Sequence, residues 1–123
     1  MHLDGKRVMI VEDDYEARES LAAVLVSEGY AVAEAEHGQA ALEQLRRSPT
    51  DFCLIVLDLF MPVMNGWAFR DAQVKDPTLA AIPVVVVTAD ATAARRASEL
   101  GIAAAMTKPV DFDRLLAVVG EYC

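Results

Sequence analysis

Acidic residues directly follow two apolar runs of this chain, where side chains of that type could bind a cation. Glu12, Asp13 and Asp14 follow the first run, and Asp58 follows another. Clustered carboxylates repel one another and are best tolerated around a positive ion. A site built only from oxygen atoms suits Mg²⁺, Mn²⁺ or Ca²⁺ rather than zinc. Few protein ligands are on offer, so water would complete the shell. This favours Mg²⁺, with Mn²⁺ as a substitute, while Asp14 is better interpreted as a helix N-cap.

A hydroxyl and an ammonium group follow two later apolar runs, at Thr88 and Lys108. A metal beside carboxylates can bind phosphoryl oxygens and neutralise the charge that develops on them. Lys108 can offset the charge of another phosphoryl oxygen, and Thr88 can donate a hydrogen bond to a third. Asp58 is then the natural nucleophile, because carboxylates can form acyl phosphates. Each residue alone is a weak signal. The prediction depends on four chain positions meeting in space, namely Glu12-Asp13, Asp58, Thr88 and Lys108.

Alternating apolar runs and helix-like stretches indicate how these residues are brought together. Strands are predicted at residues 8–11, 30–35, 53–57, 84–87 and 103–106. Helices are predicted from Asp14 to Gly29, over 38–47, from Asn65 to Asp76, from Asp90 or Thr92 to Gly101, and from Asp111 through Val119. The first, third and fourth runs are apolar throughout, which is typical of parallel strands covered on both faces. The pattern predicts an open, doubly wound α/β sheet, whose ligands bind at the carboxyl ends of the strands.

Composition sets limits on the class of protein. The 123 residues are 54% hydrophobic with a net charge of -8, which suits one domain over 1–123. The chain has no basic stripe longer than Arg46-Arg47 or Arg95-Arg96, so direct nucleic-acid binding is not expected. It also has no apolar stretch long enough for a signal peptide or a membrane span, and a cytoplasmic location is expected.

The cysteines give no sign of a disulfide framework or a zinc site. Cys53 lies within an apolar run and is predicted to be a buried small hydrophobe. Cys123 ends the sequence and is predicted to be a free thiol.

Taken in order, the motifs resemble those of the receiver domains of two-component response regulators. The matching segments are residues 8–14 (VMIVEDD), 57–66 (LDLFMPVMNG), 87–89 (VTA) and 107–109 (TKP). The resemblance covers essentially the whole chain. It implies a flavodoxin-like, doubly wound, five-stranded parallel sheet of order 2-1-3-4-5 with five helices.

The same resemblance implies roles for individual residues. Glu12, Asp13 and Asp58 would bind the metal, together with the backbone carbonyl of Phe60, and Asp58 would be the phosphoacceptor. Thr88 and Lys108 would contact the phosphoryl group, and the Lys108–Pro109 bond would be cis.

By the same resemblance, the protein would be a phosphorylation-activated signalling switch rather than an enzyme, with chemistry limited to its own phosphorylation and dephosphorylation. Asp58 would accept a phosphoryl group from a phosphohistidine in a Mg²⁺-dependent step, and a partner or output domain would read the conformational change. A sensor histidine kinase or histidine phosphotransfer protein would contact one face of the first predicted helix, formed by Tyr15, Arg18 and Ala22.

Three positions depart from the family pattern. Ala105 stands where the family commonly has Tyr or Phe, so the usual inward movement of a ring cannot occur, and we expect transmission through a loop or the fourth helix instead. Phe60 and Asp90 lie two residues beyond Asp58 and Thr88. Phe60 is expected either to hinder water reaching the acyl phosphate or merely to pack, and Asp90 to orient that water.

Other functions remain open at this point. A phosphorelay shuttle or a non-switching interaction module would use the same fold. A phosphatase of the haloacid dehalogenase type would require a second Asp two residues after Asp58, where this chain has Phe60. A flavin carrier of the flavodoxin type would need a first loop that cradles phosphate, and Glu12-Asp13-Asp14 would repel it.

Overall fold

A parallel sheet of order β2-β1-β3-β4-β5 organises residues 6–123, the part of the chain that the computed structural model describes. Its strands are β1 (Arg7–Val11), β2 (Ala31–Ala35), β3 (Phe52–Leu57), β4 (Val84–Thr88) and β5 (Ala104–Thr107). Every neighbouring pair is parallel. The predicted strand order is confirmed, and each strand lies within one residue of its predicted bounds.

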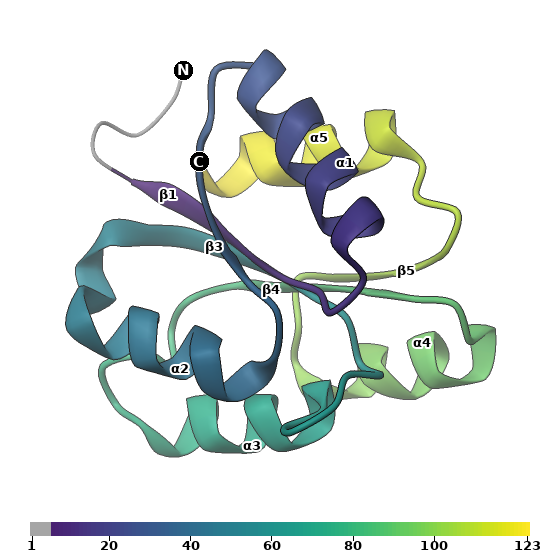
Figure 1. Ribbon diagram of the computed structural model, residues 1–123. Coiled ribbons are helices and arrows are strands. Elements are labelled where there is room, and N and C mark those ends of the chain that lie inside the picture. The colour runs from purple at the N-terminus through teal and green to yellow at the C-terminus, as the bar shows by residue number, and fades with distance from the viewer. Residues whose placement is uncertain (1–5) are drawn as a thin grey trace.

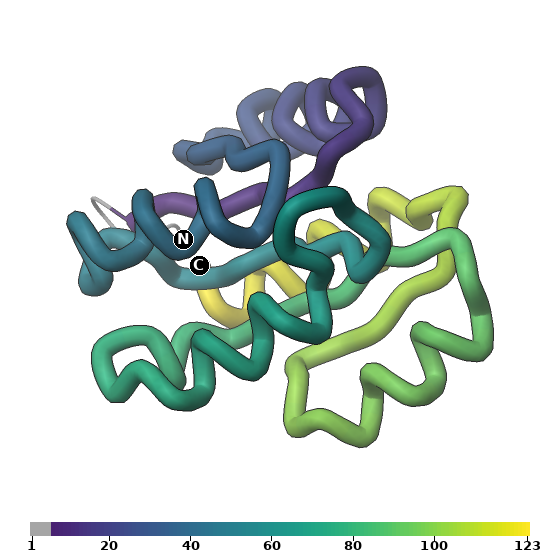
Figure 2. The backbone as a smooth tube through the Cα atoms, turned by 60° about the horizontal axis from the view of Figure 1, so that its bottom comes forward, coloured from purple at the N-terminus to yellow at the C-terminus, as the bar shows by residue number. Residues whose placement is uncertain are grey.

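Helices cover both faces of this sheet (Figure 1, Figure 2). They are α1 (Tyr15–Ser27), α2 (Gly38–Arg47), α3 (Gly66–Lys75), α4 (Ala91–Ala97) and α5 (Phe112–Tyr122), with short 3₁₀ turns at Pro49–Asp51 and Ser98–Leu100. Buried residues of α1 and α5 pack in one core cluster with alternate residues of the central strands. Those of α2, α3 and α4 pack in a second cluster on the opposite face. β3 and β4 are therefore buried along their whole length, which explains their unbroken apolar runs.

Side-chain caps fix where the helices begin. Asp14 accepts a hydrogen bond from the Ala17 N–H at 2.9 Å, and Asn65 accepts one from Ala68 at 2.9 Å. Asp90 and Asp111 cap α4 and α5 in the same way. These predicted starts are confirmed because short polar side chains satisfy the free N–H groups of a first turn.

Two helix ends differ from prediction. α4 ends at Ala97, and a 3₁₀ turn continues the chain to Leu100 before Gly101 adopts a left-handed φ of 71°. α5 continues past Val119 to Tyr122. It does so although Gly120 lowers helix propensity, and Cys123 anchors its end.

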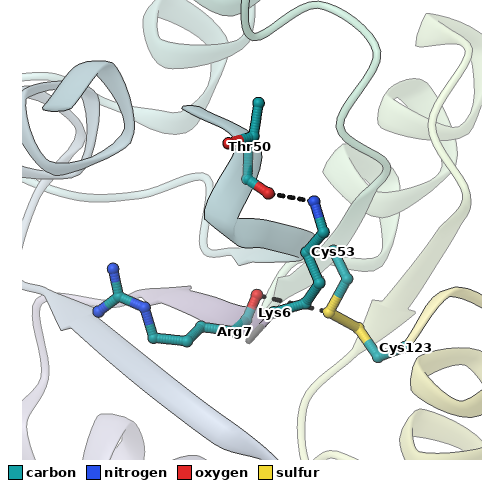
Figure 3. Close-up of a disulfide and its surroundings, with 5 residues drawn as sticks. All are labelled: Lys6, Arg7, Thr50, Cys53 and Cys123. Atoms are coloured by element: carbon teal, nitrogen blue, oxygen red, sulfur yellow. Dashed lines mark hydrogen bonds between the residues drawn. A yellow bond between two sulfur atoms is a disulfide. The ribbon is translucent and has the colours of Figure 1, made fainter. Parts of the chain in front are cut away.

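The prediction that Cys123 is a free thiol is wrong, and so is the expectation that Cys53 is unbonded. Cys53 and Cys123 are joined in a disulfide, with Cα atoms 5.5 Å apart across 70 positions (Figure 3). Both residues are buried, as expected for Cys53, but neither is a free thiol. Spacing alone gave no hint of the bond because the fold brings together residues that are remote in the sequence.

Among residues 6–123, no helix combines the length and the apolar character that crossing a membrane requires. Residues 1–5, the start of the segment in which no signal peptide is expected, lie outside this description.

Candidate functional site

The predicted acidic residues meet at the carboxyl edge of the sheet. β1 and β3 are neighbours, and their last residues, Val11 and Leu57, are paired. The Asp58 N–H donates to the Val11 carbonyl at 3.0 Å, which places Asp58 beside the chain leaving β1. One carboxylate oxygen from each of Glu12, Asp13 and Asp58 lies within 4.8 Å of the other two. Adjacent parallel strands thus bring together residues that are 46 positions apart in the sequence.

Backbone and side-chain hydrogen bonds hold Glu12 in place. Its N–H donates to the Ala35 carbonyl at 3.0 Å, and its own carbonyl accepts from Arg18 Nη1 at 2.8 Å. The Asp14 N–H donates to Glu12 Oε2 at 3.3 Å. Burial raises the pKa of Glu12; Lys108 opposes this shift and Asp58 adds to it. Burial, followed by the neighbouring Glu12, also raises the pKa of Asp13. Like charges crowded in this way favour a bound cation.

Lys108, the residue that follows β5, supplies positive charge to this cluster. Its Nζ donates to Glu12 Oε1 and lies 3.7 Å from Asp58 Oδ2. Its backbone N–H donates to the Thr88 carbonyl at 2.7 Å, and the Lys108–Pro109 bond is cis, as expected. Burial lowers the pKa of Lys108, but the surrounding carboxylates outweigh burial, and the net shift is upward. Lys108 is therefore held charged beside both carboxylates.

Thr88 ends β4 and is fully buried at the same edge. Its Oγ1 accepts a hydrogen bond from the Asp90 N–H at 3.4 Å. Asp90 Oδ1 in turn accepts from Thr92 and Ala93 and caps α4. The structure thus uses one carboxylate oxygen of Asp90 for helix capping, and the hydroxyl of Thr88 is linked to the start of α4 by a short hydrogen-bonded turn.

The loop from β3 to α3 begins at Asp58, and two of its later residues contact Asp58. The Phe60 N–H donates to Asp58 Oδ1 at 3.3 Å, while the Phe60 side chain is 53% exposed. The Gly66 N–H donates to the Leu59 carbonyl, and a Cβ on Gly66 would lie only 2.7 Å from the Asp58 carbonyl oxygen. The start of α3 therefore approaches the Asp58 peptide too closely for a side chain at position 66.

Val63, in the same loop, has a φ of 67°, which sequence reasoning missed. A β-branched residue disfavours that region, so its residue type gave no signal. It is also 79% exposed. The loop therefore carries local backbone strain close to the acidic cluster.

The cluster suits a hard divalent cation. Its donors are three carboxylate oxygens, which are ligands that Mg²⁺ prefers, and their number leaves positions for water and phosphoryl oxygens. Zinc would instead favour sulfur or imidazole ligands. Of the predicted site residues, Glu12, Asp13, Asp58 and Lys108 meet directly, while Thr88 and the Phe60 backbone lie at the border.

A sequence profile of the response regulator receiver domain matches residues 8–120. The chain belongs to the receiver domain family. Receiver domains are phosphoryl-accepting switches of two-component signalling, and they bind Mg²⁺ through an acidic pocket of the kind formed here. They interact with histidine kinases or phosphotransfer proteins and with output domains.

Known proteins agree with this assignment. The chain is 30% identical to protein PilH of Pseudomonas aeruginosa over 115 residues, covering 92% of this receiver and 93% of PilH. It is 34% identical to the transcriptional regulatory protein GlrR of Escherichia coli, covering 93% of this receiver and 25% of GlrR. It also resembles the crystal structure of the response regulator TrrA of Thermotoga maritima in complex with Mg²⁺-BeF, with a TM-score of 0.84 and 26% identity over 96% of this receiver and 99% of TrrA.

Several curated relatives are much longer than this receiver. It spans 5% of the hybrid signal transduction histidine kinase M of Dictyostelium discoideum, to which it is 31% identical over 91% of its own length, and 25% of GlrR.

One predicted partner residue does not lie on an exposed face. Ala22 is 7% exposed and packs in the core beside Leu21 and Leu25. The Arg18 side chain is 14% exposed and is held by the Glu12 carbonyl and by Glu34 at 3.4 Å. Tyr15 alone of the three is well exposed, at 62%. The prediction that Ala22 shares a free face with Tyr15 is therefore wrong.

Proposed function

We propose that Asp58 is the phosphoacceptor of this receiver, that Glu12, Asp13, Asp58 and the Phe60 carbonyl hold Mg²⁺, and that Thr88 and Lys108 contact the phosphoryl group. The supporting observation is that three carboxylates within 4.8 Å of one another share an edge with Lys108, whose Nζ is 3.7 Å from Asp58 Oδ2. A site of this composition can hold both a cation and a phosphoryl group.

The transfer itself is a simple displacement. A carboxylate oxygen of Asp58 attacks the phosphorus of a phosphohistidine, an O–P bond forms, the P–N bond breaks, and the imidazole leaves. Bound Mg²⁺ supplies charge neutralisation at phosphoryl oxygens. Lys108 holds positive charge beside the acceptor, and burial of Asp58 limits access of water to it. Hydrolysis of the acyl phosphate would return Asp58 to its starting state. On this proposal the chain performs only its own phosphorylation and dephosphorylation, and is not an enzyme with a separate substrate.

The partner is proposed to be a sensor histidine kinase or a histidine phosphotransfer protein. It would approach Asp58 over the start of α1, where Tyr15 is exposed. Ala22 is left out of this surface because it is buried. We also propose that 1–123 forms one receiver domain, and that the domain works in the cytoplasm, where such kinases present their phosphohistidines.

We infer that the signal leaves the site through α4. Ala105 is partly buried against the cluster that contains α3 and α4, but it has no ring to move. The Arg96 guanidinium of α4 instead lies 5.5 Å from the ring centroid of Trp67, which follows Gly66. Since Gly66 packs on the Asp58 peptide, Trp67 and Arg96 offer a contact path from the acceptor loop to α4.

Incubation with acetyl phosphate and Mg²⁺, followed by intact-mass spectrometry, tests the proposal. We expect one added phosphoryl group, lost in Asp58→Asn and in the absence of metal. Sustained hydrolysis of a phosphate ester would instead favour the phosphatase. Transfer of the phosphoryl group from Asp58 to a histidine phosphotransfer protein would favour the phosphorelay shuttle.

A further inference from the structure

Cys53 occupies an irregular position in the sheet. In the parallel pairing of β1 with β3, Arg7 faces Phe52 but the next residue, Val8, faces Leu54. Cys53 is therefore the extra residue of a β-bulge. Bulges are rare between parallel strands, and they re-aim the side chain of the residue that they insert.

The bulge changes the face on which Cys53 lies. Along a regular strand, successive side chains alternate between faces. Here Phe52 and Ile55 belong to the core cluster under α2, α3 and α4, whereas Cys53 and Leu54 both belong to the cluster under α1 and α5. Counting back from Ile55, regular alternation would have pointed Cys53 away from α5. The bulge instead directs it toward the end of that helix.

The disulfide attaches the last turn of α5 covalently to β3. The buried residues of α5 are Leu115 and Val119, and residues 120–122 are exposed. Cys123, only 5% exposed, is the next residue that reaches the core (Figure 3). Loss of its bond to Cys53 would remove the covalent link between this turn and the sheet. The packing of Tyr122 and Cys123 would remain, with helical hydrogen bonds such as the one from the Cys123 N–H to the Val119 carbonyl at 2.8 Å.

The structure can also accommodate a reduced Cys53. Its Sγ lies 3.4 Å from the Arg7 carbonyl oxygen. In the disulfide the sulfur carries no proton, so this is only a contact; a thiol at the same position could donate a hydrogen bond there. The first residue of β1 thus provides an acceptor for the thiol, and reduction need not disturb the strand.

We propose that Cys53 and Cys123 form a reversible thiol–disulfide site that holds or releases the C-terminal turn of α5. The oxidant is a low-molecular-weight disulfide of the glutathione class. The two thiols lose two protons and two electrons, an S–S bond forms between them by way of a mixed disulfide, and the oxidant is reduced to two thiols. Cys53 lies five residues before Asp58 on an extended strand, roughly 16 Å away, so this site acts on α5 and not on the carboxylates. The proposal does not depend on the phosphorylation chemistry.

The native chain is equilibrated in glutathione buffers of graded ratio. Alkylation with a maleimide in denaturant, which exposes both buried cysteines, followed by intact-mass spectrometry, then reads its redox state. We expect two labels at high reduced glutathione, none at high oxidised glutathione, and full recovery of each state when the buffer is exchanged. The proposal is overturned if the native chain keeps its disulfide in every buffer, or if the two thiols form only mixed disulfides with glutathione.

Hydrogen exchange of a peptide covering residues 116–123 measures the release of α5. We expect exchange at the last turn to be at least about tenfold faster in the reduced chain, because local opening no longer breaks a cross-link. Cys123→Ser and Cys53→Ser should match the reduced wild type in both buffers. Equal protection of the turn in the oxidised and reduced chains would refute release.

The variant Asp58→Asn is the matched control, because it removes the proposed phosphoacceptor and keeps both cysteines. Its redox titration should follow that of the wild type, and acyl phosphate formation should proceed in the reduced chain. A titration altered in Asp58→Asn would contradict independence of the two sites. If a Ser variant fails to fold, the reduced and oxidised wild type still give the comparison.

Discussion

Arg96 of α4 lies over the indole ring of Trp67, with its guanidinium carbon 5.5 Å from the ring centroid. Trp67 belongs to the first turn of α3, directly after a glycine that packs against the peptide of Asp58. A cation over an aromatic face contributes about 0.5–1 kcal/mol at an exposed site. Because Ala105 has no ring, this contact provides a side-chain link between the acceptor loop and α4.

Removal of the guanidinium should therefore uncouple Trp67 from α4. In Arg96→Ala we expect phosphorylation, or a beryllium fluoride mimic, to change Trp67 emission less than in the wild type, while the rate of acyl phosphate formation stays within about twofold, since the carboxylates are untouched. The exposed neighbour Arg95 gives the control, Arg95→Ala. Equal emission changes in both variants would rule out this route.

Binding of Mg²⁺ should stabilise the folded chain. A ligand at ten times its dissociation constant adds about 1.4 kcal/mol to the free energy of unfolding. For a domain of this size, that raises the thermal midpoint by roughly 5 °C. Asp13→Asn removes a carboxylate of the cluster and should abolish the shift, measured by calorimetry with and without Mg²⁺. Asp113→Asn, which removes an exposed carboxylate on α5, should keep it. A full shift in Asp13→Asn would argue against the assigned ligands.

The stability of the metal-free chain should depend on Glu12. Burial, with a further contribution from Asp58, raises the folded pKa of Glu12 above its ordinary value of 4.5. A raised acid pKa contributes stability that is fully present below the unfolded pKa and is lost as pH rises through the folded pKa. Urea titrations from pH 4.5 upward should therefore show a steeper loss in the wild type than in Glu12→Gln. The exposed Glu43→Gln is the control, and parallel pH profiles for all three would contradict this assignment.

Gly66 should not tolerate a side chain. A Cβ there would lie 2.7 Å from both the Asp58 carbonyl oxygen and the Leu59 Cα, which are backbone atoms that cannot turn away. We expect Gly66→Ala to cost about 1–3 kcal/mol of the free energy of unfolding, and to slow phosphorylation by shifting Asp58.

Gly120→Ala is the matched control. Its Cβ would meet only the Tyr30 hydroxyl, at 3.7 Å, and it lies within α5. Alanine there should raise the free energy of unfolding by about 0.5–1 kcal/mol in a denaturant titration, because it favours the helical backbone. Equal effects of the two alanines would show that the approach to Asp58 is not tight.

Much of the fold could be predicted because its signals are local. The apolar runs before Glu12 and Asp58 mark strands buried on both faces, and Asp14, Asn65 and Asp111 mark helix starts. The meeting of the acidic residues followed from one rule, that parallel strands end at the same edge.

The missed features depend on finer geometry. Arg18, Ala22 and Leu25 share one stripe at helical spacing, so Ala22 belongs with the core; its small side chain gave little hydrophobic signal. The disulfide required a bulge at Cys53 and an extra turn of α5, neither of which residue types reveal. The φ of Val63 is set by the loop against the residue's own preference.

Direct identification of the phosphorylated residue decides whether Asp58 is the phosphoacceptor. Chain phosphorylated with acetyl phosphate and Mg²⁺ can be reduced with borohydride, which converts an aspartyl phosphate into homoserine, and then digested and sequenced by mass spectrometry. We expect homoserine at position 58 and reduction at no other acidic residue, with no homoserine formed when Mg²⁺ is removed. Homoserine at Asp13, hydroxynorvaline at Glu12, or phosphorylation that persists in Asp58→Asn would contradict this assignment.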